Sequence, residues 1–147
     1  MKADKAPYVL FVCVHNSGRS QMARAFFDSI SDGTILAQSA GTMPDEEVNP
    51  DVIQVMAEVG IDVGVQRPRL LTQEMVAGAL EIVTMGCGVE EVCPVVFGET
   101  VDWGVDDPKG RTLQDVRMIR DKINAEVGTL WRELSDAHST LEGDPRE

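Results

Sequence analysis

The chain has 147 residues, and its 13 Lys and Arg residues against 25 Asp and Glu residues give a net charge of −12. This length suits one domain with a buried core, and a hydrophobic fraction of 43% is ordinary for a globular protein. Because nucleic acids and anionic membranes are bound through basic surface, the acidic balance argues against both as partners.

The predicted elements alternate between strands and helices. The first strand, 8–14, is continuously apolar, as expected for a parallel strand covered on both faces. It is too short to span a membrane and lacks the cleavage site of a secretory signal, so we expect a cytoplasmic protein with reduced thiols. The pattern then predicts a helix over 20–31, a strand over 34–39, a helix from Asn49-Pro50 to Gly60, a short helix over 72–78 and a strand over 81–85.

The last third of the chain contains a fourth strand and the clearest helix. The strand is either 95–97 or 100–103. Thr112 and Asp115 predict a capping box, after which apolar residues recur at steps of three or four: Leu113, Val116, Ile119, Ile123, Val127, Leu130 and Leu134. The polar segments 1–6 and 135–147 are expected to be flexible around an ordered core of about 7–134.

These elements predict a single α/β domain over residues 1–147. We expect a four-stranded parallel sheet with helices on both faces. Since such sheets bind ligands at the carboxyl ends of their strands, a binding loop should follow the first strand.

The most informative segment is residues 13–20, of sequence CVHNSGRS, between the first strand and the first helix. Backbone N–H groups of such a loop and of a helix N-terminus can converge on an oxyanion, and Arg19 can hold two of its oxygens. The same positive field, with the Ser20 hydroxyl, favours the thiolate of Cys13. The segment therefore predicts an anion cradle with a nucleophile at its base. The alternative is that Cys13 is a small buried apolar residue.

The chain resembles the low-molecular-weight protein tyrosine phosphatases and, within that fold, the arsenate reductases that use a relay of cysteines. The similarity extends from about residue 8 to residue 134. Its landmarks are 13–20, Ser39-Ala40-Gly41, Asn49-Pro50, Gly60-Ile61-Asp62, 87–94 and Asp107-Pro108. The resemblance implies that Cys13 is the catalytic nucleophile and that the oxyanion is held by His15, Asn16, Ser17, Gly18, Arg19 and Ser20.

Two further cysteines, Cys87 and Cys93, follow the third predicted strand. Because parallel strands end at one edge, Cys87 is expected within reach of Cys13, and the glycines that flank Cys87 would let the segment rearrange. In the reductases that the chain resembles, such cysteines form a disulfide during the reaction, and an external thiol reductant then reduces it. No bound cofactor takes part. The donor stays open between thioredoxin, glutaredoxin and a low-molecular-weight thiol. Buried thiols and a zinc site remain alternatives.

Asp107 before Pro108 matches the general acid of the family, which protonates the departing oxygen. Asp106 is an adjacent rival, and Asp-Pro is also a frequent turn. Phosphatases of this fold usually carry aromatic residues after this pair. The chain has Lys109-Gly110 there, which favours a small tetrahedral oxyanion over a phosphotyrosine ring.

Three residues near the cradle have supporting roles or depart from the family. Several bacterial members bind potassium through a Glu in the first helix, but the chain has Arg24 at that position, so no metal is predicted. Asn16 is expected to buttress the loop, since Asn tolerates left-handed backbone. Ser39 follows the second predicted strand, either as a support of the loop or as a turn residue.

The leading hypothesis is an arsenate reductase that acts through Cys13, Cys87 and Cys93. The alternative is a phosphatase that hydrolyses phosphomonoesters with Cys13, Arg19 and Asp107 alone. A non-catalytic oxyanion binder is the third possibility.

Overall fold

The computed structural model describes residues 7–85 and 100–141. The strands are β1 (Tyr8–Cys13), β2 (Leu36–Gly41), β3 (Glu81–Thr84) and β4 (Thr100–Asp102), and the helices are α1 (Arg19–Ile30), α2 (Pro50–Ala57), α3 (Gln73–Gly78) and α4 (Leu113–Leu141). All the strand pairs are parallel, in the order β2-β1-β3-β4. The predicted four-stranded parallel sheet in one α/β domain is confirmed.

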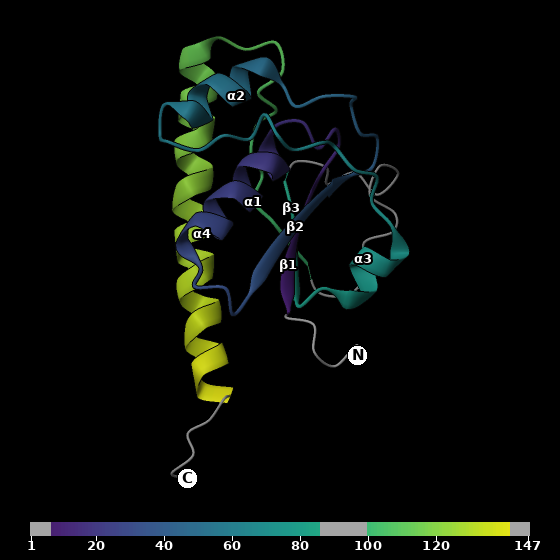
Figure 1. Cartoon of the computed structure of the whole chain (residues 1–147), viewed down its shortest axis with the longest axis vertical. Helices are drawn as coiled ribbons and strands as arrows, with labels where there is room; N and C mark the ends of the chain where they lie inside the picture. The colour runs from purple at the N-terminus through teal and green to yellow at the C-terminus, as the bar shows by residue number, and fades with distance from the viewer. Residues whose placement is uncertain (1–6, 86–99, 142–147) are drawn as a thin grey trace.

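The central strand β1 is buried from Val9 to Cys13 because helices cover both of its faces. Figure 1 shows α1 and α4 on one side of the sheet and α3 on the other. Since strand side chains alternate between faces, Val9, Phe11 and Cys13 join the larger core with α1, α2 and α4, while Leu10 and Val12 pack in a smaller core beside α3. This alternation leaves Cys13 at the end of β1, on the side where α1 begins.

The helix boundaries follow local capping chemistry. Asn49 Oδ1 accepts a hydrogen bond from Asp51 N at 2.8 Å, and Pro50 is the first residue of α2. Gly60 has a φ of +84°, and its N–H donates to Ala57 O at the end of the helix. Thr112 Oγ1 accepts from Asp115 N at 3.1 Å, which caps α4.

Two sequence expectations concern the elements observed at the end of the chain. β4 is Thr100–Asp102, which corresponds to the second of the two predicted positions, whereas 95–97 lies outside the described residues. α4 extends to Leu141, beyond residue 134, where the ordered core was expected to end, and the flexibility of the tail stays a prediction. Residues 135–141 include no Gly or Pro, the two residue types that most disfavour a helix. Within the described ranges, no helix is long and apolar enough to cross a membrane.

Glu58 connects the end of α2 to α4 through two arginines. Arg117 Nε and Nη2 donate to its carboxylate at 3.0 and 2.9 Å, and Arg120 Nη1 donates at 2.8 Å. The hydrogen bond from Arg117 is the largest cause that lowers the pKa of Glu58 below its ordinary 4.5. A pKa that is lowered by folding stabilises the protein above the unfolded-state value, and this contribution is lost as the pH falls through the folded-state value.

Glu58→Gln is therefore expected to lower the Tm at pH 7, by roughly 2 °C or less because exposed ion pairs contribute little. Thermal unfolding at pH 7 and at a pH below the lowered pKa of Glu58 tests this, since the carboxyl of the parent protein is neutral only below that pKa. An equal Tm difference at both pH values would contradict the electrostatic origin.

Candidate active site

Residues 13–20 form a tight loop between β1 and α1, with the Cys13 side chain at its base and only 1% exposed. The Sγ of Cys13 lies 2.9 Å from Ser20 Oγ and accepts a hydrogen bond from Asn16 N at 3.3 Å. Both groups lie at hydrogen-bonding distance from the sulfur. Residues of the 13–20 segment therefore surround the Cys13 thiol, as the sequence motif predicted.

A chain of hydrogen bonds sets the direction of the Ser20 hydroxyl. Arg69 N donates to Asn16 Oδ1 at 2.8 Å, which fixes the orientation of that amide. Asn16 Nδ2 then donates to Ser20 Oγ at 2.6 Å, so the hydroxyl proton of Ser20 is available to Cys13 Sγ. Gln21 Nε2 also donates to Asn16 O at 3.1 Å, and Asn16 itself has a φ of +50°. The buried Asn16 side chain therefore holds the cradle together by hydrogen bonds to residues inside and outside it.

The backbone of the cradle is held from outside by the segment between β2 and α2. Thr42, Met43, Asp45 and Asn49 donate their N–H groups to the carbonyls of Cys13, Val14, His15 and Ser17 respectively. In a trans peptide the carbonyl and the next N–H point in opposite directions. The N–H groups that follow these four carbonyls therefore face away from that segment and are available to an anion. One of these groups is the N–H of Asn16, which donates to Cys13 Sγ.

Gly41, at the end of β2, permits this close approach. A Cβ at this position would lie 2.6 Å from Val14 O and 2.9 Å from Asn16 N. Any larger residue would push the β2 end away from the cradle.

His15 and Ser17 turn their side chains toward the same outer segment. His15 Nδ1 donates to Met43 O at 3.2 Å and lies 3.6 Å from Asp45 Oδ1. Ser17 Oγ donates to Asp45 Oδ2 at 2.9 Å. Asp45 therefore ties two cradle residues in place. Sequence reasoning missed it, because nothing in the pattern around Asp45 relates it to a loop 28 residues earlier.

Arg19 connects the cradle to the loop after β4. It is 5% exposed; its Nη1 donates to Val105 O at 3.1 Å, and its Nη2 lies 3.7 Å from Asp107 Oδ2. The Asp107 side chain is 43% exposed, whereas Asp106 points to Arg111 at 3.9 Å and is 70% exposed. The geometry favours Asp107 over Asp106 as the carboxyl group of the site.

Ser39 and Arg24 lie apart from this constellation. Ser39 is buried inside β2, opposite Phe11, so it does not follow the strand as expected: β2 continues to Gly41. Arg24 pairs with Asp28 at 3.0 Å along α1. Cys87 and Cys93 lie outside the described residues. Among the residues described, no group of three His, Cys, Asp or Glu side chains could hold a metal ion.

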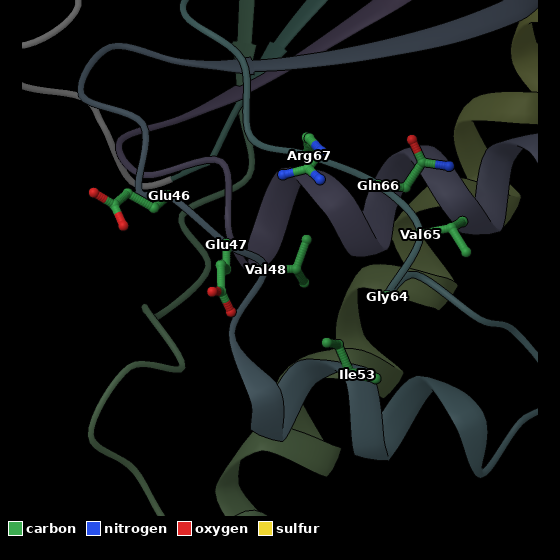
Figure 2. Close-up of a pocket in the computed structure, with 8 residues that line it drawn as sticks. All are labelled: Glu46, Glu47, Val48, Ile53, Gly64, Val65, Gln66 and Arg67. Atoms are coloured by element: carbon green, nitrogen blue, oxygen red, sulfur yellow. The ribbon is translucent and has the colours of Figure 1, made fainter.

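A separate open pocket of about 500 Å³ lies between the loop before α2 and the segment before α3 (Figure 2). It is lined by Glu46, Glu47, Val48, Ile53, Gly64, Val65, Gln66 and Arg67. None of these residues belongs to the 13–20 cradle, so the pocket and the cradle are separate features.

Comparisons with known proteins agree with this geometry. A family model described as low molecular weight phosphotyrosine protein phosphatase matches residues 8–140. The chain is 36% identical over 143 residues to a putative arsenate reductase of Halobacterium salinarum, across 92% of this chain and 98% of that protein. It is 35% identical over 133 residues to the glutaredoxin arsenate reductase of Synechocystis sp., across 86% of this chain and 98% of that protein. The solved thioredoxin-dependent arsenate reductase of Corynebacterium glutamicum matches with a TM-score of 0.76 and 32% identity, over 92% of this chain and 65% of the other.

Proposed function

The chain belongs to the low molecular weight phosphotyrosine protein phosphatase family, and we propose that within this family it reduces arsenate to arsenite. One observation favours reduction over hydrolysis. β3 ends beside the strand of Cys13, with Met85 N donating to Val12 O at 2.9 Å, and Cys87 follows only two residues later, with Cys93 beyond it. Hydrolysis of a phosphate ester has no use for two additional thiols.

In the proposed first step, arsenate oxygens accept hydrogen bonds from the cradle N–H groups and from Arg19. The Cys13 thiolate attacks arsenic, and an oxygen leaves as water after it takes a proton from Asp107. A thiol–arsenate adduct remains, with arsenic still in the +5 state. Arg19 Nη2, now 3.7 Å from Asp107, is the contact that the incoming oxyanion would share or replace.

The reduction itself takes place by thiol exchange. The Cys87 thiolate attacks Cys13 Sγ, the electron pair of the S–As bond passes to arsenic, and arsenite in the +3 state leaves. Cys93 then attacks Cys87, which releases the Cys13 thiolate and forms a Cys87–Cys93 disulfide. An external dithiol reductant reduces that disulfide. The names of two relatives favour thioredoxin or glutaredoxin as this partner. Because the relay begins from reduced thiols, we propose the reducing cytoplasm as its place of action.

Phosphatase activity is the second candidate, because phosphate and arsenate are tetrahedral oxyanions of the same charge pattern. The same Cys13, Arg19 and Asp107 would form and break a phosphocysteine. Hydrolysis alone would therefore not exclude reduction, whereas dependence on Cys87 separates the two.

The proposal is tested by mixing the fully reduced protein with arsenate in the absence of any reductant, and by mapping its disulfides by peptide mass spectrometry. We expect one arsenite per protein and a Cys87–Cys93 bond. Three free thiols and no arsenite would overturn the relay and leave the phosphatase, or a reductase that needs a small-molecule thiol.

Cys93→Ser should stop the same reaction one step earlier. We expect one arsenite per protein and a trapped Cys13–Cys87 disulfide, because no thiol remains to free Cys13. Repeated turnover of this variant with thioredoxin as the only reductant would contradict the place of Cys93 in the relay.

A further inference from the structure

We propose that Gly18 is a positioning residue for proton transfer: its missing side chain sets how closely the Asp107-Pro108 turn approaches the cradle. The inference rests on the proposed role of Asp107 as the proton donor. It gives Gly18, whose N–H belongs to the cradle, a second role that depends on its missing side chain.

The contact that carries the inference joins Gly18 to Pro108. A Cβ at Gly18 would lie 2.8 Å from Pro108 Cγ, 3.4 Å from Pro108 Cδ and 3.6 Å from Val52 Cγ2. Ordinary contacts between carbon atoms are about 3.5–4.0 Å, so the ring would have to retreat by about 1 Å. A proline ring cannot swing aside as a flexible side chain can, because its φ is fixed by the ring closure.

Retreat of Pro108 would displace Asp107, since the two are joined by one planar peptide. The turn is otherwise well tied: Lys109 N donates to Asp107 Oδ1 at 3.0 Å, and Arg111 Nε donates to Asp107 O at 3.1 Å. The turn would therefore move as a unit, and the 3.7 Å approach of Asp107 Oδ2 to Arg19 Nη2 would lengthen. A misplacement of about 1 Å can cost on the order of a hundredfold in rate.

The expected damage is confined to one side of the site. Apart from the chain neighbours Ser17 and Arg19, the three nearest atoms to a Cβ at Gly18 are all in Pro108 and Val52. Alanine retains the N–H of residue 18, so the anion loses no donor. Binding of the oxyanion should therefore persist while proton delivery weakens.

The test is Gly18→Ala, assayed for arsenite release in a single turnover and for hydrolysis of aryl phosphates whose leaving groups differ in pKa. We expect kcat and the single-turnover rate to fall about tenfold or more, with KM changed by less than about twofold. The loss should be larger for poor leaving groups, which depend on the acid. Gly128→Ala on α4 is the matched control: its Cβ would meet only Arg132 Nη1, at 3.8 Å, and its rates should equal those of the parent.

Removal of the opposing ring should repair the defect. Pro108→Ala deletes the Cγ and Cδ atoms, so the double variant Gly18→Ala/Pro108→Ala should lose less activity than the two single losses multiplied together. Unchanged rates in Gly18→Ala would overturn the inference, as would equal losses for good and poor leaving groups, or losses that simply multiply. A protein that hydrolyses aryl phosphates without reducing arsenate would refute the proposed function alone, and the leaving-group comparison would still decide the role of Gly18.

Discussion

Cys13→Ser is expected to abolish both arsenate reduction and phosphomonoester hydrolysis, each by roughly 10⁴-fold or more. A serine hydroxyl is a much weaker nucleophile than the thiol that it replaces, whose Sγ lies 2.9 Å from Ser20 Oγ and 3.3 Å from Asn16 N. Removal of the nucleophile therefore prevents the first bond to arsenic or phosphorus. Arsenite release and hydrolysis of an aryl phosphate measure the two losses.

The same variant separates chemistry from binding. The N–H groups of the cradle and Arg19 are unchanged in Cys13→Ser, so phosphate should still raise the Tm of the variant in proportion to its binding. Loss of this stabilisation would mean that the substitution disrupts the cradle itself. Turnover at the parent rate would exclude Cys13 as the nucleophile and would refute the proposed mechanism.

Cys87→Ser is expected to remove arsenate reduction to below detection and to leave slow phosphatase activity in place. The first attack and the proton transfer need only Cys13, Arg19 and Asp107. The thiol–arsenate adduct, by contrast, cannot yield arsenite until a second thiolate attacks Cys13 Sγ. Parallel assays with arsenate plus thioredoxin and with an aryl phosphate provide the measurement.

A comparison with Cys93→Ser sharpens this result. Both variants lack one of the two additional thiols, but Cys93→Ser should still release one arsenite, whereas Cys87→Ser should release none. If Cys87→Ser lost both activities equally, Cys87 would be a structural thiol. If it reduced arsenate repeatedly, another thiol would have to take its place.

The outline of the fold was readable from the sequence because the relevant signals are local. The apolar run that forms β1, the Asn49-Pro50 start of α2 and the periodic apolar residues of α4 each depend on neighbouring residues alone. The end of α4 was not readable in this way. Polar composition indicated a tail over 135–141, but a helix that already packs on the sheet continues through polar residues until a breaker intervenes.

The sequence by itself determined the cradle, because Cys13, Arg19 and Ser20 lie in one loop between a strand and a helix, and that loop can close in only a few ways. Only the tertiary structure decided which distant residues contact this loop. Asp45, Arg69 and Asp107 reach it from 28, 53 and 88 residues away in the chain. The pattern around Asp45 and Arg69 does not predict these contacts, and Asp107 was expected only from the resemblance to the family. The contacts result from the order of the parallel strands and from the close approaches at Gly18 and Gly41. The choice of Asp107 over Asp106 has the same origin: adjacent residues of identical chemistry are distinguished only by which of them the folded turn directs at Arg19.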